Sequence, residues 1–323
     1  HTTGRYTETQ RLLERALNIL EQTVPPDKHK YALLYNSLAV MYQDTGRYAE
    51  AEARYKKALE IIEKAYGPEH PDMAARLNNL AGLYRETGRY AEADSAIKRA
   101  IKIFKKTYGL NHPNLAALLS NLAFLCGKHG QDTEAEALLK WALRITEKAL
   151  GHDHPVVAAR LSNLAGLHQD TGRHAEAEPL YHRALKISAT ARSPETSWAV
   201  LHGLSRLSAK MNRPGAAIFF GKQAVNTIQD MRQNVWRMGR DTLKTYDVTI
   251  EHAFKHLSGI LIDAGRLPEA EEVLKLLKQR EYFEHIQLDA NHRDGLSHKI
   301  HFTAIEEPFH ALYEERSAAL SSA

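Results

Sequence analysis

The chain has 323 residues and a formal net charge of +4, from 43 Lys and Arg against 39 Asp and Glu. This near balance argues against direct nucleic-acid binding, which needs an excess of basic residues gathered on one face. A mean hydropathy of −0.45 and the lack of an apolar run of about 18 residues argue against a membrane protein, and a single Cys argues against a disulfide scaffold.

The first 190 residues repeat at intervals of 42 residues. Leu-Ala pairs and single alanines keep the same register through the repeats. Internal repeats of this length predict a solenoid of stacked helical units. The glycines that mark the interval are Gly4, Gly46, Gly88, Gly130 and Gly172.

Each repeat predicts two helices. Leu77, Leu80, Ala81 and Tyr84 are spaced i, i+3, i+4 and i+7, which is the apolar stripe of an amphipathic helix. Gly88 ends this helix because glycine accepts the left-handed conformation of a helix end. A second stripe starts a few residues later, and a turn ending in His-Pro leads to the next repeat, with proline at the first helical position.

The pattern from Leu77 to Ala93 resembles a tetratricopeptide repeat (TPR) of the 42-residue kind found in kinesin light chains. Residues 201–221 continue it in degenerate form, with Asn212 in the glycine position. The resemblance implies an all-α fold, a right-handed superhelical solenoid of antiparallel helix pairs with a concave groove. We expect residues 1–227 to form this TPR array.

Beyond the array the spacing breaks, and we expect residues 228–290 to form a divergent helical hairpin. Its first helix is predicted at Asp241–Ala264 and its second at 267–288. The stretch from Gly265 to Glu284 resembles the junction that precedes a caspase-like CHAT peptidase domain in bacterial TPR-CHAT proteins. We expect residues 291–323 to be a tail, with a short helix near 307–320, that leads to a C-terminal domain this chain does not contain.

No catalytic or metal site is expected in this chain. Cys126 stands in the repeat position of Tyr42, Tyr84 and His168, so it is interpreted as a buried packing residue rather than a nucleophile. Histidines precede a proline at one point of three repeats, which favours a turn over a metal site, and the tail histidines lack the spacing of metal ligands. No phosphate-binding glycine loop occurs, so no cofactor is expected. The histidines are His70, His112 and His154 in the repeats and His292, His298 and His301 in the tail.

The residues beside the packing stripe of each first helix are the candidate partner-binding residues. Asparagines can both donate to and accept from an extended peptide backbone, and Arg or Lys can pair with acidic groups. Alternatively, some asparagines cap helices or bond neighbouring helices. Mid-helix Gly82 and Gly166 indicate either close approach of a partner or tight helix packing. The predicted set is Asn36, Asn78, Asn79, Arg85, Asn121, Phe124, Lys128, Asn163 and Gln169.

The sequence therefore predicts a scaffold that binds a protein or an extended peptide, without catalysis in this chain. The resemblance implies the sensing part of a TPR-CHAT peptidase, and some members of that family are partners of RNA-guided type III-E CRISPR effectors. The alternative is a stand-alone adaptor similar to kinesin light chains. No signal-peptide pattern is present, so a cytoplasmic location is expected, with no direct nucleic-acid or membrane partner.

Overall fold

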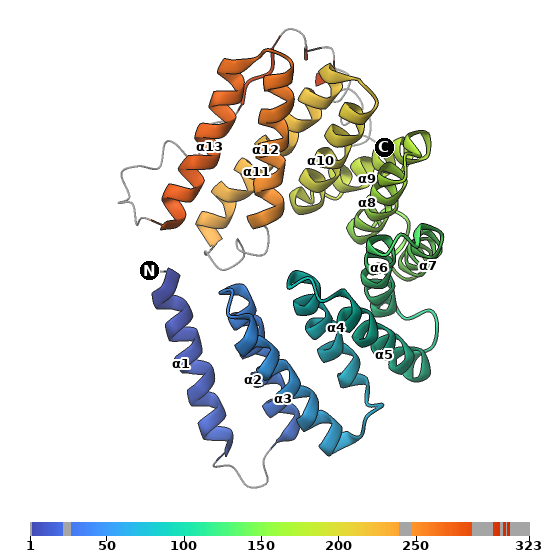
Figure 1. Ribbon diagram of the computed structural model, residues 1–323, viewed down its shortest axis with the longest axis vertical. Coiled ribbons are helices and arrows are strands. Elements are labelled where there is room, and N and C mark those ends of the chain that lie inside the picture. Colours follow the sequence, from blue (N-terminus) through green and yellow to red (C-terminus); the bar gives the residue numbers. More distant parts are fainter. Residues whose placement is uncertain are drawn as a thin grey trace. The chain divides into compact units, whose positions relative to one another are not determined.

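A computed structural model describes residues 2–21, 27–238, 247–285, 300–303, 306–307 and 309–310 (Figure 1). Within these ranges the regular structure is entirely helical, which confirms the predicted all-α class. The helices are α1 (Thr2–Glu21), α2 (Lys28–Asp44), α3 (Tyr48–Tyr66), α4 (Pro71–Glu86), α5 (Tyr90–Tyr108), α6 (Pro113–Lys128), α7 (Asp132–Leu150), α8 (Pro155–Asp170), α9 (His174–Thr190), α10 (Pro194–Lys210), α11 (Pro214–Met238), α12 (Asp247–Asp263) and α13 (Leu267–His285).

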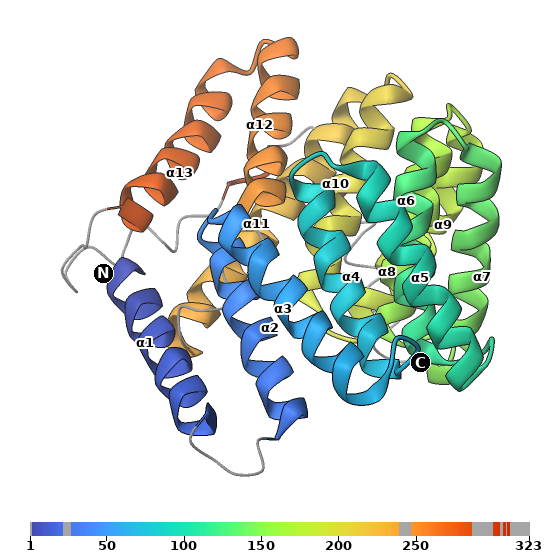
Figure 2. The ribbon, with the colours of Figure 1, turned by 60° about the horizontal axis from the view of Figure 1, so that its bottom comes forward.

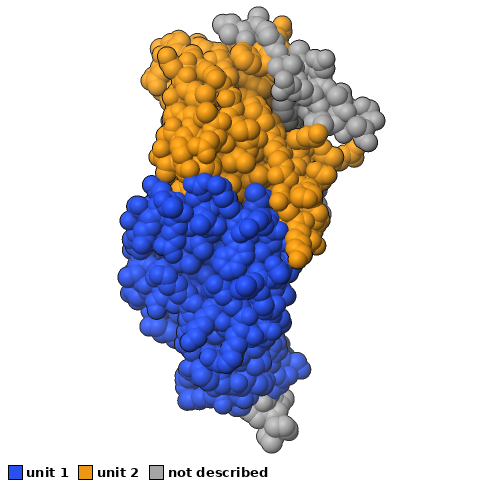
Figure 3. All heavy atoms as spheres, turned by 90° about the vertical axis from the view of Figure 1, so that its right-hand side faces the viewer, with its two compact units in different colours: residues 1–145 blue, residues 146–323 orange. Residues whose placement is uncertain are grey.

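The chain divides into two compact units, residues 1–145 (unit 1) and 146–323 (unit 2), coloured separately in Figure 3. In unit 1, α2 packs against α3 and α4 against α5. In unit 2, α8 packs against α9, α10 against α11 and α12 against α13. Short turns join the two helices of each pair, so the helices run antiparallel (Figure 1). The predicted solenoid of helix pairs is therefore present in both units.

The turn inside each pair has one conformation, and it extends into the degenerate repeats. Gly88 has φ +75°, and Arg89 N donates to Tyr84 O at 2.7 Å, which satisfies a carbonyl at the end of α4. Asn212 takes the glycine position with φ +56°, since asparagine tolerates the left-handed region. Gly265 repeats the conformation at +72°. The repeat thus persists structurally where its sequence motif has faded.

The His-Pro turns between pairs begin the next helix. Nδ1 of His70 accepts a hydrogen bond from Asp72 N at 3.3 Å, and His112 and His154 accept equivalent bonds at 3.2 Å. Each of these histidines is the N-cap of a helix, and proline is the first residue of that helix. The interpretation of these three histidines as turn residues is confirmed.

Buried alanines and cross-repeat ion pairs hold neighbouring pairs together. The alanines that keep the 42-residue register are almost completely buried, so larger side chains would overfill these helix contacts. In unit 1, Glu52 of α3 accepts from Arg89 at 2.6 Å and from the Tyr84 hydroxyl at 3.1 Å. Burial would raise the pKa of Glu52, but hydrogen bonds from Arg89, Lys56 and Tyr84 lower it to about 2. In unit 2, Arg213 and Glu178 repeat this pairing at 2.7 Å.

Cys126 is a core residue, as the sequence predicts. Its side chain is buried on α6, and burial raises the pKa of its thiol, which disfavours the thiolate that a nucleophile needs.

The C-terminal helices differ in their limits from those expected. The helix predicted at Asp241–Ala264 is described as α12 from Asp247, and the segment up to Met238 belongs to α11. Apolar residues of α11, α12 and α13 share one core with Ile300. Residues 239–246 and 286–299, with His292 and His298, and most of the helix expected near 307–320 lie outside the described residues.

Candidate partner-binding surface

Seven of the nine predicted partner-binding residues lie on the first helices of successive pairs in unit 1, α2, α4 and α6 (Figure 2). We refer to these residues as the α2–α4–α6 surface. All seven side chains are partly or fully exposed. They are Asn36 on α2, Asn78, Asn79 and Arg85 on α4, and Asn121, Phe124 and Lys128 on α6.

The asparagines of this surface bond to one another across the repeats. Nδ2 of Asn79 donates to Oδ1 of Asn36 at 2.9 Å, and Nδ2 of Asn121 donates to Oδ1 of Asn78 at 2.8 Å. The alternative that some asparagines bond neighbouring helices therefore holds for these four. Each bond uses one of an amide's two N–H groups, so polar capacity remains for a ligand while the bond fixes the amide's orientation.

Phe124 lies between two cations. Its ring is 43% exposed, with the Arg85 guanidinium carbon and the Lys128 Nζ each 5.4 Å from the ring centroid. Both cations are therefore within cation–π range of the ring. Together they offer an apolar contact flanked by positive charge, which suits a hydrophobic side chain next to an acidic one.

The two mid-helix glycines differ in their surroundings. A Cβ added at Gly82 of α4 would meet no atom within 4 Å, so helix packing does not explain this glycine. A Cβ at Gly166 of α8 would lie 3.7 Å from the Tyr181 hydroxyl, an ordinary contact. Gly203 of α10 is the glycine that packing requires, because its Cβ would lie 2.4 Å from the Tyr181 ring.

The two remaining predicted residues lie on α8, in unit 2. Asn163 is exposed. Gln169 differs from the expectation, since it is only 1% exposed and its Oε1 accepts from the Tyr181 hydroxyl at 3.0 Å. A glutamine at this repeat position is thus a buried partner for a tyrosine, and we leave Gln169 out of the proposed surface.

The sequence does contain a signal for the hydrogen bond between Gln169 and Tyr181, although our prediction from helix faces did not use it. Gln43 has the same repeat position as Gln169, and it accepts from the hydroxyl of Tyr55, again 12 residues later. In the second repeat the corresponding residues are Arg85 and Ile97, so the side chain of Arg85 has no such tyrosine to bond. The loss of the tyrosine coincides with the partly exposed arginine of the candidate surface.

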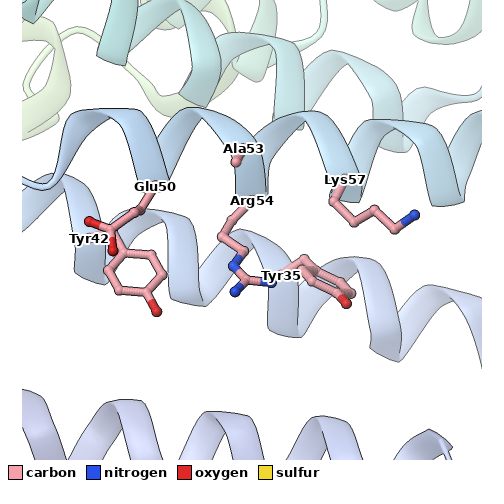
Figure 4. Close-up of a pocket in the computed structure, with 6 residues that line it drawn as sticks. All are labelled: Tyr35, Tyr42, Glu50, Ala53, Arg54 and Lys57. Atoms are coloured by element: carbon pink, nitrogen blue, oxygen red, sulfur yellow. The ribbon is translucent and has the colours of Figure 1, made fainter.

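A separate pocket of about 290 Å³ lies on α2 and α3 (Figure 4). Arg54 lies beside Tyr35, with its guanidinium carbon 5.7 Å from the ring centroid. Hydrogen bonding to Arg47 lowers the pKa of Glu50. The pocket therefore offers phenol rings and charged groups to a polar side chain. Its lining residues are Tyr35, Tyr42, Glu50, Ala53, Arg54 and Lys57.

Neither a metal site nor a membrane-spanning helix occurs among the described residues. No three His, Cys, Asp or Glu side chains there are grouped closely enough to hold a metal ion. No helix in that part of the chain combines the length and apolar character of a membrane span.

A profile of the tetratricopeptide repeat matches residues 1–60, 30–106, 73–148, 142–190 and 156–230. These matches cover more than half of the sequence, and the chain belongs to the tetratricopeptide repeat family. No curated protein sequence matches it.

Solved structures support the same fold. BtubC (BKLC) from P. vanneervenii is 23% identical, with a TM-score of 0.54 over 59% of this chain and 76% of that one. A variant of a protein described as a kinesin light chain with nearly identical TPR-like repeats, from Podosopora anserina, is 26% identical, with a TM-score of 0.54 over 64% of this chain and 99% of that one. Apo RapI is 15% identical, with a TM-score of 0.60 over 84% and 90%. The TPR fold supports a role in protein interaction.

Proposed function

We propose that the chain is an interaction scaffold that binds an extended peptide segment of a protein partner on the α2–α4–α6 surface. The observation that carries the proposal is the placement of exposed Phe124 between Arg85 and Lys128, beside asparagines whose amides are held in fixed orientations. Nothing in this mode of binding requires catalysis by the chain.

The ligand chemistry follows from these groups. The remaining amide N–H and carbonyl groups of Asn79 and Asn121 bond a peptide backbone of any sequence. Bare backbone at Gly82 lets that peptide approach α4 closely. Phe124 contacts an apolar side chain, and the two cations pair with carboxylates near it. The preferred ligand is therefore an extended segment with an apolar residue among acidic ones.

Selection from a phage-displayed library of linear peptides, followed by fluorescence anisotropy with the full chain, tests this proposal. We expect Phe124→Ala to weaken binding of the selected peptides by about 2 kcal/mol, roughly 30-fold, as for an aromatic hot spot. We expect Asn79→Ala to cost about 1 kcal/mol, the value of one hydrogen bond.

The matched controls are Leu110→Ala, an apolar residue that is 54% exposed on the turn before α6, and Lys102→Ala on the exposed face of α5. Neither should change the affinity, and circular dichroism should show that every variant keeps its helix content. If the selected peptides bind all variants equally, the α2–α4–α6 surface is not the binding site.

For the larger context, we propose that residues 1–227 are the binding array and residues 228–290 the junction to a CHAT-type peptidase domain in a cytoplasmic bacterial protein. The support is the resemblance of the stretch from Gly265 to Glu284 to such a junction. Association with an RNA-guided effector would then be indirect, through protein contacts.

The coding sequence that follows Ala323 decides between this context and a stand-alone adaptor. A His and a Cys in a caspase-like setting there support the peptidase context, and their absence overturns it. The adaptor alternative also predicts that deleting residues 241–290 leaves peptide binding unchanged.

A further inference from the structure

A short segment near the end of the chain, described at residues 300–303, 306–307 and 309–310, contacts α11 and Arg266, which lies in the turn directly before α13 of unit 2. We refer to these described residues as segment 300–310. Asn226 of α11 bonds its backbone in both directions, since Oδ1 accepts from Ile300 N at 2.8 Å and Nδ2 donates to Ile300 O at 2.9 Å. Ile300 is only 1% exposed and belongs to the core shared by α11, α12 and α13. A side-chain amide thus binds one residue of a segment as it would bind an extended peptide.

Two cations bind the next part of the segment. Lys222 of α11 is fully buried, and its Nζ donates to the His301 carbonyl at 2.7 Å and to Oε2 of Glu306 at 2.9 Å. Arg266 donates to Oε1 of Glu306 at 2.5 Å and to the Thr303 hydroxyl at 3.2 Å. Glu306 is itself 0% exposed. Its carboxylate is therefore the buried acidic group that this site recognises.

The charge of the site is balanced only with the segment in place. On the helix side, Lys222 and Arg266 share Glu269, which accepts from both at 2.6 to 2.7 Å. These three groups leave one excess positive charge, and Glu306 neutralises it. Lys222 and Arg266 both donate to Glu306 and leave one positive charge unpaired without it, so together with Glu269 they have the chemistry of a carboxylate receptor.

Aromatic contacts complete the site. The Phe219 ring centroid lies 5.5 Å from that of Phe302 and 6.1 Å from that of Phe309. A Cβ on Gly215 of α11 would come within 3.5 Å of the Phe309 ring, so the glycine leaves room for that side chain. The contacts with segment 300–310 therefore define a ligand pattern with an apolar residue at its first position. An aromatic residue lies two positions after that residue, and a glutamate lies six positions after it.

We propose that α11 and the start of α13, with Arg266 in the turn before it, form a second peptide-binding site. Segment 300–310 occupies it as a resident ligand that an acidic partner segment of the same pattern displaces. Desolvation offsets much of the attraction within a buried ion pair, so the ion pairs of Glu306 stabilise the bound segment less than their number suggests. The polar contacts described above come from three side chains, Asn226, Lys222 and Arg266, and they add to the apolar contacts of Ile300 and Phe302. The site shares no residue with the α2–α4–α6 surface, so either proposal can fail without the other.

The test uses the full chain and a labelled synthetic peptide with the sequence of residues 299–311. We expect the peptide to bind the Glu306→Gln chain at least tenfold more tightly than wild type, because the resident ligand is weakened while its receptor is intact. Glu307→Gln is the matched control, a neighbouring exposed carboxylate that should leave the affinity at the wild-type value. Adding Asn226→Ala to the Glu306→Gln chain should abolish the gain.

Hydrogen exchange of the unaltered chain provides a readout that does not depend on a variant. Excess peptide should reduce protection of the amides of residues 300–303, and a peptide carrying the Glu306→Gln change should not. If the peptide does not bind the Glu306→Gln chain and leaves exchange in the wild-type chain unchanged, the segment is a fixed part of the fold and the proposal is overturned.

Discussion

The α2–α4–α6 surface of unit 1 and the α11–α13 site of unit 2 use the same side-chain chemistry in two states. In unit 1, Asn79 and Asn121 bond to other asparagines and remain accessible, while Phe124 is exposed between two cations. In unit 2, Asn226 and Lys222 are buried against a segment of the chain itself. The comparison teaches that the same amide and cation chemistry is partly exposed in unit 1 and buried against residues of the chain itself in unit 2. In our proposals the two sites differ in whether the chain supplies the ligand.

The largest expected effect is on the buried ion network of unit 2. Lys222→Met keeps the length of the side chain but leaves the buried Glu306 and the partly buried Glu269 with Arg266 as their remaining cation. Breaking a buried ion pair in this way costs about 3–5 kcal/mol, and we expect the free energy of unfolding to fall by that amount. Urea denaturation of the full chain measures it.

The control for that variant is Lys275→Met on α13. Lys275 pairs with Glu271 at 2.8 Å, but both side chains are 67% exposed. A solvent-exposed pair contributes about 0–1 kcal/mol, so this variant should unfold close to wild type. Equal destabilisation by both lysine variants would contradict the difference between a buried and an exposed network.

Tight packing in unit 2 should appear as a large cost at Gly203. An alanine there places its Cβ 2.4 Å from the ring of Tyr181, which is buried and held by its hydrogen bond to Gln169. Since the ring cannot move without breaking that bond, we expect a loss of about 1–3 kcal/mol in unfolding free energy. Gly203→Ala with wild-type stability would show that the α8–α9–α10 contact is looser than the structure indicates.

Acid should destabilise unit 2 through a buried histidine pair. Burial, together with the nearby His256, Arg206 and His252, lowers the pKa of His202 from 6.5 to about 3. Below pH 6.5 the unfolded chain takes up a proton that the folded chain excludes, so the free energy of unfolding falls as the pH drops toward 3. At about 1.4 kcal/mol per pH unit, the loss between pH 6.5 and pH 5 is about 2 kcal/mol.

Urea denaturation at the two pH values compares wild type with His202→Gln, whose side chain does not titrate. The pKa of His256 is also lowered, mainly by burial, so part of the pH dependence should remain in the variant. Parallel pH profiles for the two proteins would show that His202 does not contribute.

The 42-residue period predicts the helices, their turns and the buried Cys126, because each depends on residues within one repeat. It also predicts which faces of α4 and α6 are exposed. The burial of Gln169 has a signal only in the tyrosine 12 residues later, as at Gln43 and Tyr55, and a prediction based on helix faces alone does not use it. The pairing of Lys222 with Glu306 joins residues 84 positions apart without any periodic signal, so it needs the three-dimensional structure.

The smallest expected effect separates stability from binding on the α2–α4–α6 surface. Gly82→Ala adds a Cβ that meets no atom within 4 Å, so the favourable helix propensity of alanine should stabilise the chain by about 1 kcal/mol. The same methyl group covers backbone that the proposed ligand approaches, so peptides selected on the wild-type chain should bind the variant more weakly.

Gain of stability with loss of binding is the opposite of what a damaged fold produces, and it distinguishes this glycine from Gly203, where stability itself should fall. Thermal unfolding and anisotropy on the same preparation measure both quantities. If Gly82→Ala raises stability and leaves peptide affinity unchanged, a partner does not come close to α4 at this position, and the ligand lies nearer to Phe124 and α6.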